Sequence, residues 1–437
     1  MKNRKVGRKR SFVPFVRPFR PPTRKEAIEA CANLDMRDEL KPLTSFKQVP
    51  RCTSQDDWFA QYCEEGQSFT EFMSWCPWLS PRKCRGIKQE FIPSEKTLPQ
   101  RYPNGSIYLL PIGEFSSHSS PDFQNLVEYS QIFFGIPVKT LPIADIIIKA
   151  NSEVFCRSHG STKEFWIKSR TKGEKYQLNI YTLLDFVRSV APDDALATIA
   201  LTMSDIYQAT PDLFVAGMAA GLHRVAVFSF CRYNPNIQFS PEFWYEMNEK
   251  RTNYSKLEIR NLILVRSCRL LVHEIAHLLG LAHCIYYECC MNGSGHLEED
   301  FRQPMFLCPV DIHKLFRLCG FDILQRYHDL KQFFKKFNLV KEVNWLDQRL
   351  EAIQKVRLNK IDPISKQQQP AVRSSNPLTK RKLDKNNTKT NGNLTIPLVA
   401  QTPVINNEKH CVDSSIKRIP KIKIRIGKND CYKVVPI

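Results

Sequence analysis

The sequence predicts an α/β (α+β) domain in which a mixed twisted sheet packs on one long helix, with a small helical region before it and disordered basic tails. Three observations lead to this fold class. Strand-like and helix-like patterns alternate from residue 106 to residue 231, which is typical of a sheet covered by helices. An apolar run from Leu262 to Leu271 then predicts a helix. The excess positive charge lies in the two ends of the chain.

The distribution of charge separates the tails from the body. The chain has 437 residues and a net charge of +20. Residues 1–25 hold ten Lys and Arg and no acid, and residues 355–437 hold eighteen against five acids, which leaves residues 26–354 at −3. The tails are too polar to bury a core. A body without basic excess disfavours a nucleic-acid groove, so only weak contact through the tails is expected. The basic run at 2–10 is either a nuclear address or a solvated tail.

Cysteine usage bears on the compartment. The chain has 15 cysteines, an apolar segment does not follow its basic start, and no run of 18 apolar residues occurs in it, so neither a secretory signal nor a membrane span is predicted. We expect a monomer in a reducing intracellular setting, cytoplasmic or nuclear or both. In that setting clustered cysteines favour metal binding over disulfides, whereas scattered ones such as Cys31, Cys156 and Cys268 are expected to be buried small residues.

Changes in composition divide the chain into five predicted segments: a basic tail at 1–25, a helical cap and linker at 26–103, a main domain at 104–340, a helical extension at 341–356 and a basic, mostly disordered tail at 357–437. The cap is rich in aromatic residues and is expected to pack on the main domain. Cys76 and Cys84 lie in it at a spacing that matches no standard metal site, so we assign them a structural role.

Within the main domain the patterns predict elements in order. Strands are expected at 106–112, 136–148, 195–202 and 223–231, and helices at 121–134, 179–191, 322–337 and 340–356. Residues 234–256, broken by Pro235 and Pro241, are predicted to form a surface loop. The alternation of basic and β-branched residues from Ile416 to Pro436 indicates either a strand or a docking motif.

The helix predicted after Leu262 carries the chemistry. His273 and His277 are four residues apart and therefore lie on one helix face, one turn apart, which is the spacing at which two imidazoles bind one zinc ion. Glu274 lies on a neighbouring face, where a carboxylate can take a proton from a metal-activated water. The bland alternative is a pair of solvated histidines on an amphipathic helix.

Two further residues extend the pattern. Gly280 suits the left-handed backbone at a helix C-terminus, so the chain can turn and bring His283 to the same metal. Three protein ligands with an open fourth position form the catalytic arrangement of zinc. A match at all five fixed positions favours a zinc site over accident.

The stretch HEIAHLLGLAHC, followed by Cys289-Cys290-Met291 and Cys308, resembles the archaemetzincins, a family of zinc metallopeptidases among the metzincins. Further similarity lies at 217–219, 227–233, 293–299 and 308–310, and the resemblance covers about residues 104–340, with a weak extension at 55–80. It implies a metzincin-like fold, catalytic zinc on His273, His277 and His283, and Met291 at the Met-turn. It also implies that the strand before the zinc helix, at 224–231, is the sheet edge that pairs with an extended peptide.

The family places four cysteines around a second, structural zinc. Here Cys284, Cys289 and Cys308 match, but Asp311 stands at the fourth position. We favour Asp311 as a weaker fourth ligand, because a carboxylate oxygen can also bind zinc. The alternatives are substitution by His313, Cys290 or Cys319, or three simple thiols. We expect Asp311→Cys to raise zinc affinity and the melting temperature.

The function that the resemblance implies is zinc-dependent hydrolysis of peptide bonds, aminopeptidase-like or as a restricted endopeptidase, with zinc-activated water and Glu274 as general base. The alternative is a catalytically silent, zinc-stabilised binding or adaptor protein that its basic tails direct. A zinc finger for nucleic acid is a third reading, which the acidic residues Glu288, Glu298 and Glu299 disfavour. Intact His273, Glu274, His277 and His283 favour the enzyme.

Overall fold

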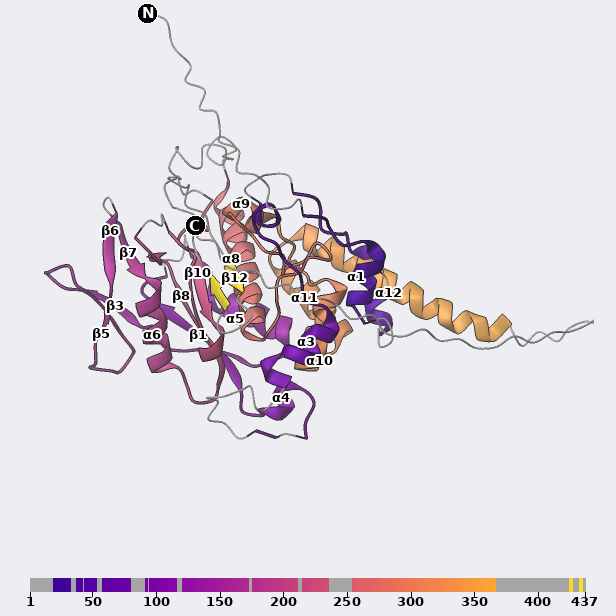
Figure 1. Ribbon diagram of the computed structural model, residues 1–437, viewed down its shortest axis with the longest axis horizontal. Coiled ribbons are helices and arrows are strands. Elements are labelled where there is room, and N and C mark those ends of the chain that lie inside the picture. The colour runs from indigo at the N-terminus through magenta and orange to yellow at the C-terminus, as the bar shows by residue number, and fades with distance from the viewer. Residues whose placement is uncertain are drawn as a thin grey trace, which may run out of the picture. The chain divides into compact units, whose positions relative to one another are not determined.

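A computed structural model (Figure 1) describes residues 19–366, except residues 33–36, 42, 53–56, 80–90, 93, 116–119, 173–174, 211–213 and 236–253, together with 424–426 and 432–434. The predicted tail at 1–25 lies mostly outside this range, and so do Cys84 and most of the predicted loop at 234–256. Among the described helices, none combines the length and the apolar character needed to cross a bilayer.

A five-stranded mixed sheet forms the centre of the molecule. Its order is β10-β11-β8-β1-β2, and its strands are β1 Ser106–Ile112, β2 Val138–Thr140, β8 Ala195–Thr202, β10 Gly217–Ala220 and β11 Val225–Ser229. β1 pairs in parallel with both β2 and β8, β11 pairs in parallel with β8, and only β10 is antiparallel to its neighbour. Every residue of β1 and β8 is buried, as expected for strands covered on both faces.

The expectation that 224–231 forms the sheet edge is wrong. β11 lies inside the sheet, between β8 and β10, and the edge strand is β10. The reason is a tight reversal through the 3-10 turn η5 (Gly221–His223) and the left-handed residue Arg224, with φ 55°. That reversal lets the short strand Gly217–Ala220 fold back along the outer side of β11.

The predicted long strand at 136–148 is also wrong, because it is two strands in different sheets. β2 ends at Thr140, and β3 (Asp145–Ile148) pairs with β4 (Val154–Arg157), which pairs with β5 (Phe165–Ile167). Pro142 lies between β2 and β3, and proline cannot donate a hydrogen bond to a strand ladder. A second small sheet contains β6 Ser169–Lys172, β7 Lys175–Asn179 and β9 Asp205–Tyr207.

The helices at the sheet confirm the predicted pattern. α5 (Phe123–Phe134) and α6 (Ile180–Val190) begin at the N-caps Asp122 and Asn179, whose side chains accept backbone N–H bonds. α5 follows β1 toward β2, whereas α6 leads back to β8 on the other side of β1, so right-handed crossovers place them on opposite faces. Figure 1 shows α6 on one side of the sheet and α8 (Lys256–Leu278) on the other, next to α5.

The part of the chain before β1 forms short helices. They are α1 Arg24–Ala30, η2 Asp38–Leu40, η3 Leu43–Ser45, α2 Trp58–Gln61, α3 Phe69–Trp75, η4 Pro77–Leu79 and α4 Leu98–Arg101. The predicted small helical region is therefore present. Trp58, Phe72 and Trp78 are almost fully buried and belong to the same hydrophobic core as the central sheet. The segment boundaries at 103 and 340 stay predictions.

Four helices follow the central helix. They are α9 Leu297–Arg302, α10 Pro309–Cys319, α11 Ile323–Lys336 and α12 Val340–Lys366. The helices predicted at 322–337 and 340–356 are confirmed, but α12 continues ten residues beyond the predicted end. Its extra length contains good helix formers such as Arg357 and Leu358. In the C-terminal stretch, β12 (Ile424–Ile426) and β13 (Tyr432–Val434) pair in antiparallel fashion.

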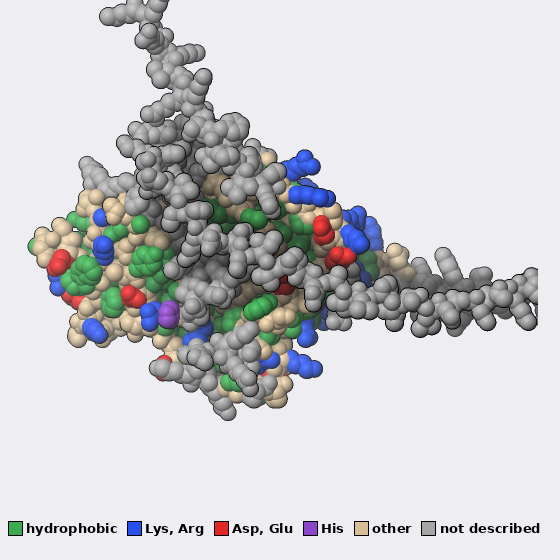
Figure 2. All heavy atoms as spheres, viewed as in Figure 1, with side chains coloured by type: hydrophobic (Ala, Val, Ile, Leu, Met, Phe, Trp, Pro, Cys, Tyr) green, Lys and Arg blue, Asp and Glu red, His purple; other side chains and the backbone are tan. Residues whose placement is uncertain are grey.

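The visible surface carries charges of both signs. Figure 2 shows Lys and Arg side chains interspersed with Asp and Glu side chains and with apolar groups on the described part of this face. This mixture agrees with the small net charge of residues 26–354.

Candidate metal centre

The structure brings three histidines to one point inside the protein. The side-chain nitrogens of His273, His277 and His283 that could bind an ion all lie within 4.8 Å of one another. His273 and His277 come from successive turns of α8, and their Nε2 atoms are 2.9 Å apart. All three rings are buried, with exposed fractions of 4% or less. The pair of solvated histidines on a helix is therefore excluded.

The turn that delivers His283 has the hydrogen bonds of a Schellman motif. The Leu281 N–H donates to the Ala276 carbonyl at 3.0 Å, and the Gly280 N–H donates to the His277 carbonyl at 2.9 Å. Gly280 has φ 97°, a backbone conformation that costs little only for glycine. A Cβ atom there would also lie 3.2 Å from the Cys76 sulfur. Gly280 is therefore needed both for the turn and for the contact with the N-terminal region.

The hydrogen bonds of the rings fix their tautomers. His273 Nδ1 donates to the Cys290 carbonyl and His277 Nδ1 donates to the Leu281 carbonyl, each at 2.7 Å. Burial lowers the pKa of His273 to about 3 and lowers the pKa of His277 well below its ordinary value. Both rings are therefore neutral, and their proton is on Nδ1. Their Nε2 lone pairs face each other and cannot hydrogen-bond to one another.

A cation fits this donor set. The His283 ring donates through Nδ1 to Glu64, so its Nε2 atom carries a lone pair. This Nε2 atom is buried and has no hydrogen-bond partner among the described residues. Two nitrogens on one tetrahedral zinc, at bonds of about 2.0–2.1 Å, lie about 3.3 Å apart, close to the observed separation. A zinc ion held by His273, His277 and His283 would satisfy all three lone pairs.

Glu274 follows His273 on α8 and is buried, with 1% of its surface exposed. Its Oε2 atom has no hydrogen-bond partner among the described residues. Burial, and next the nearby Asp300 carboxylate, raise the pKa of Glu274 to about 8. A small cavity next to Glu274 reaches Gly217 of the edge strand β10 and, on its other side, Tyr233 and Asp300. The Tyr233 hydroxyl donates to the Asp300 carboxylate at 2.9 Å.

Met291 is fully buried. Its carbonyl accepts the Cys284 N–H at 2.7 Å, and this bond closes the loop between residues 284 and 291. The position is consistent with the packing role that the sequence predicts for Met291.

Sequence reasoning missed the side chains that the N-terminal region sends to the histidine segment. Glu64 accepts a hydrogen bond from His283 Nδ1 at 3.0 Å. The Gln67 amide donates to the Gly280 carbonyl and accepts the Ala282 N–H, each at 3.2 Å. Trp78 Nε1 donates to the Leu278 carbonyl at 2.9 Å. Gln67 and Trp78 satisfy backbone atoms at and after the end of α8, whereas Glu64 binds a side chain. Only the weak resemblance at 55–80 pointed to this region.

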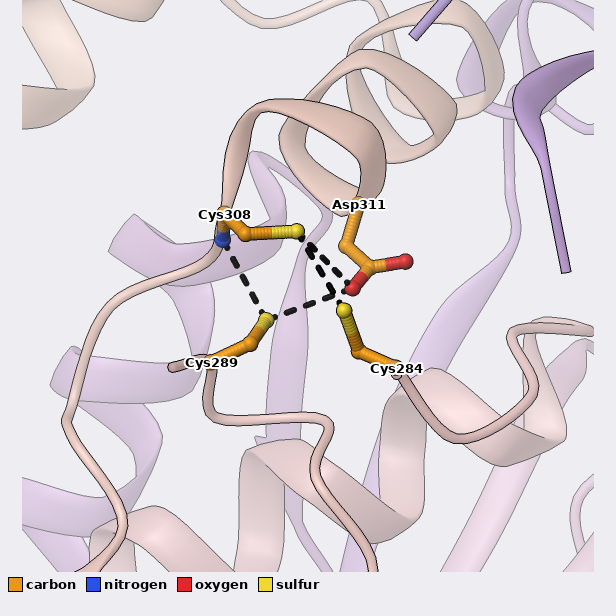
Figure 3. A group of neighbouring side chains, drawn as sticks. All are labelled: Cys284, Cys289, Cys308 and Asp311. Atoms are coloured by element: carbon orange, nitrogen blue, oxygen red, sulfur yellow. Dashed lines mark hydrogen bonds between the residues drawn. The ribbon is translucent and has the colours of Figure 1, made fainter. Parts of the chain in front are cut away.

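A second cluster contains Cys284, the residue that follows His283 (Figure 3). Cys284 Sγ is 3.5 Å from Cys308 Sγ, and Asp311 Oδ2 is 3.2 Å from Cys289 Sγ and 3.3 Å from Cys308 Sγ. All four residues are buried, and their ligand atoms lie within 4.8 Å of one another. Cys308 is the N-cap of α10 and Asp311 lies in its first turn, so the helix start places both side chains at the cluster.

The charges of this cluster are arranged for a cation. Burial opposes ionisation of Cys284, but hydrogen bonds from the Cys289 and Cys308 thiols outweigh it and lower the pKa of Cys284. Burial, and next the charge of Cys284, raise the pKa of Asp311 to about 6. The buried Lys314 ammonium lies 2.8 Å from Asp311 Oδ1. Three sulfurs and one carboxylate oxygen are a ligand set that zinc accepts.

The other candidates for the fourth position lie elsewhere. His313 Nδ1 donates to the Cys31 carbonyl, and its ring stacks on Phe69 with a centroid distance of 3.7 Å. The Cys290 thiol faces the Arg269 carbonyl. Neither belongs to the cluster, and Cys319 does not either. Cys31, Cys156 and Cys268 are buried, as expected.

Comparisons with known proteins identify similar sequences and structures. Residues 170–317 match the model of peptidase family M54. The chain is 30% identical over 321 residues to archaemetzincin-2 of Mus musculus, a match that covers 70% of this chain and 79% of that protein. It is 30% identical over 238 residues to archaemetzincin-1 of Homo sapiens, covering 51% of this chain and 45% of that protein.

Among solved structures, the archaemetzincin of Archaeoglobus fulgidus matches with a TM-score of 0.31 and 23% identity, over 48% of this chain and 99% of that chain. The identity and coverage of the archaemetzincin-2 match are high enough to assign the family. The chain therefore belongs to the archaemetzincins and is a zinc metallopeptidase.

Proposed function

We propose that His273, His277 and His283 hold the catalytic zinc and that Glu274 is the general base of peptide-bond hydrolysis. The observation that carries this proposal is the convergence of three buried imidazole nitrogens, with a buried carboxylate on the residue that follows the first histidine of α8. His273 and His277 are neutral and donate through Nδ1, which is the state in which imidazole binds a metal.

The residues of the chain divide the chemistry among them. When bound, zinc supplies Lewis-acid polarisation of the scissile carbonyl and makes water acidic enough to attack near neutral pH. The Glu274 carboxylate accepts the proton of the attacking water and passes it to the leaving amine. Burial raises the pKa of Glu274 to about 8, which makes the ionised carboxylate a stronger proton acceptor but favours its protonated form at neutral pH. The positive charge of a bound zinc ion would lower this pKa and keep Glu274 ionised before the attack.

We propose β10 as the strand that binds the extended peptide. It is the edge of the central sheet, and Gly217 of β10 lines the cavity that reaches Glu274. A peptide that hydrogen-bonds to an edge strand is held by its backbone, which gives affinity with little dependence on sequence.

We propose a second, structural zinc on Cys284, Cys289, Cys308 and Asp311. It would tie the 284–291 loop to the start of α10. Because His283 and Cys284 are consecutive, a rigid second site would also limit the movement of the third histidine. The support for this site is the buried four-residue cluster of Figure 3.

The finer properties of the enzyme are also proposals. We propose either aminopeptidase-like or restricted endopeptidase action, and the pair of alternatives can be separated with peptides that have free or acetylated N-termini. We further propose a monomeric intracellular enzyme, cytoplasmic or nuclear or both. Fractionation of cells that express the tagged full chain, and light scattering of the purified protein, test these two expectations.

The experiment that tests the proposed activity uses a diverse peptide mixture read by mass spectrometry. Zinc-loaded wild type is compared with Glu274→Gln and with Glu351→Gln, a control at an exposed ion pair of α12. We expect new peptide termini with wild type and Glu351→Gln only. New termini with Glu274→Gln at the wild-type rate would contradict the assignment of the base, and no cleavage by zinc-loaded wild type would contradict the proposed activity.

A further inference from the structure

We propose that Glu64 is a positioning residue for His283, so that the N-terminal region completes the catalytic zinc site. This inference rests on the proposed function, because it takes His283 as the third ligand. Glu64 and His283 are 219 positions apart in the chain, and the spacing of the histidine motif gives no sign of the contact.

The hydrogen bond from His283 to Glu64 differs from those of the other two rings. His273 and His277 donate to backbone carbonyls, whereas His283 Nδ1 donates to a carboxylate, Glu64 Oε1, at 3.0 Å. A carboxylate can only accept, so it keeps the proton of His283 on Nδ1 and directs the Nε2 lone pair toward the metal. An anionic acceptor also makes the imidazole a stronger donor to a metal ion.

His283 needs this support more than its two partners. His273 and His277 are held in register by the backbone of α8, but His283 follows the helix end and the turn at Gly280. Its ring is 0% exposed, so neither solvent nor a helix turn can orient it. The carboxylate of Glu64 is the polar group that holds Nδ1.

Trp58 in turn holds Glu64. Its indole N–H donates to the same oxygen, Glu64 Oε1, at 2.7 Å, and its ring lies edge-on to the His283 ring, with centroids 5.1 Å apart. Its backbone N–H donates to the Glu299 carboxylate at 2.9 Å. A Cβ atom on Gly293 would lie 2.4 Å from the indole ring, so glycine is required there for Trp58 to lie so close.

Gln67 fixes the other side of the same segment. It donates to the Gly280 carbonyl and accepts the N–H of Ala282, the residue just before His283. The segment 58–67 therefore contacts residues 280–283 through the Trp58 ring, the Glu64 carboxylate and the Gln67 amide. This arrangement indicates that metal retention depends on docking of the N-terminal region.

A purely structural role for Glu64 predicts a different result from a positioning role. If Glu64 only anchors Trp58, its replacement lowers stability and affects both metal sites alike or neither. If it positions His283, its replacement speeds zinc loss at the histidine site and leaves the Cys284–Asp311 site unchanged. The two metal sites of one chain thus serve as test and internal reference.

The experiment measures release of zinc from the full-length, zinc-loaded protein to an excess of chelator, with native mass spectrometry to follow each ion. Glu64→Ala removes the acceptor, and Glu64→Gln keeps the size and an acceptor oxygen but loses the charge. Glu65→Ala, at the exposed neighbouring position, is the matched control. We expect release from the histidine site to be about 10- to 100-fold faster in Glu64→Ala, smaller but measurable acceleration in Glu64→Gln, and no change in Glu65→Ala.

Cobalt substitution gives a second readout. The ligand-field absorption of cobalt at the histidine site should change in Glu64→Gln, whereas the thiolate-to-cobalt absorption of the cysteine site should not. Release at the wild-type rate in both Glu64 variants would overturn the inference. If Glu64→Ala does not fold, the isosteric Glu64→Gln decides alone. A wild type that binds no zinc at the histidines would instead refute the proposed function.

Discussion

The buried ion pair between Lys314 and Asp311 explains how a carboxylate can stand where the family has a fourth cysteine. The two side chains are 1% and 0% exposed and lie 2.8 Å apart. One carboxylate oxygen, Oδ1, bonds to the ammonium group, and the other, Oδ2, faces the sulfurs of Cys289 and Cys308. The lysine therefore both orients the carboxylate and offsets part of the negative charge of the cluster.

This pair makes Lys314 a test of the second site. We expect Lys314→Met to speed zinc release from the cysteine cluster by about 10-fold or more, because groups that orient metal ligands typically contribute that much. The measurement is chelator competition on the zinc-loaded protein. The control is Lys336→Met, which removes an exposed ion pair with Glu128 of similar length, 2.7 Å, and should change little. Equal release rates in the two variants would count against Asp311 as a ligand.

The same ion pair refines the expectation for Asp311→Cys. Four thiolates are the ligands that closed zinc sites prefer, but the substitution also removes the partner of a buried ammonium group, which is costly. We therefore expect the gain in zinc retention and in melting temperature to be larger in Asp311→Cys/Lys314→Met than in Asp311→Cys alone. Zinc retention equal to wild type in both backgrounds would show that position 311 does not bind the metal.

The sequence predicted ligands better than the residues that support them. His273, His277 and His283, and Cys284, Cys289, Cys308 and Asp311, form two clusters because each set has a spacing that a helix, a turn or a helix start converts into proximity. Lys314 lies three residues after Asp311 on α10, a helical spacing that the sequence analysis did not use. Glu64 has no such spacing. Glu64 reaches its partner only through the tertiary packing of a segment 219 positions away, which periodicity cannot reveal.

At the scale of elements, the end of α8 is the point where helix geometry and the N-terminal region meet. The last turn of the helix ends at Gly280. Trp78 donates a hydrogen bond to the Leu278 carbonyl, and Gln67 donates one to the Gly280 carbonyl. A helix end buried without such partners would be unstable. Both the turn at Gly280 and the contacts from the N-terminal region therefore determine the direction in which the chain leaves α8.

Gly280→Ala tests this element. We expect a loss of stability of about 1–3 kcal/mol, because alanine resists φ 97° and its Cβ would crowd Cys76 at 3.2 Å and Pro77 at 3.3 Å. Gly160→Ala is the matched control, with φ 71° but no atom within 4 Å of the added Cβ, and it should lose about 1 kcal/mol. Chemical denaturation of both zinc-loaded variants gives the comparison. Equal losses would mean that the contact with Cys76 and Pro77 does not matter.

The order of the strands in the sheet could not be predicted from sequence patterns. The composition of 223–231 predicted a strand, and β11 is there, but composition does not say which strand lies at an edge. That assignment depends on the reversal at Gly221–His223, which gives the four-residue strand β10 the outer position. Similarly, the apolar stretch at 136–148 predicted one strand because Pro142 was not treated as a break between β2 and β3.

At the scale of the whole molecule, the charged ends and the zinc-binding body are predicted to have separate roles. The body carries a net charge of −3, although the full chain carries +20, and both metal clusters lie within residues 273–311. We propose that peptide cleavage uses these clusters and the sheet edge at β10.

Deletion of residues 1–18 and 367–437 tests this separation. We expect peptide cleavage and zinc content per chain to be unchanged, because every residue assigned to the two sites and to their support lies between 58 and 314. The measurement is kcat/KM on one cleaved peptide, with the full chain as reference. Loss of cleavage with zinc retained would show that a tail takes part in the activity.

The most direct test of the central claim is the zinc content of wild type, His277→Ala and Cys308→Ser by native mass spectrometry, with peptide cleavage measured on the same samples. We predict two zinc ions in wild type and one in each variant, with the His277→Ala protein inactive and its remaining ion held by the cysteine cluster. A His277→Ala protein that still holds two ions, or that cleaves peptides as wild type does, would contradict the claim that the three histidines form the catalytic metal site.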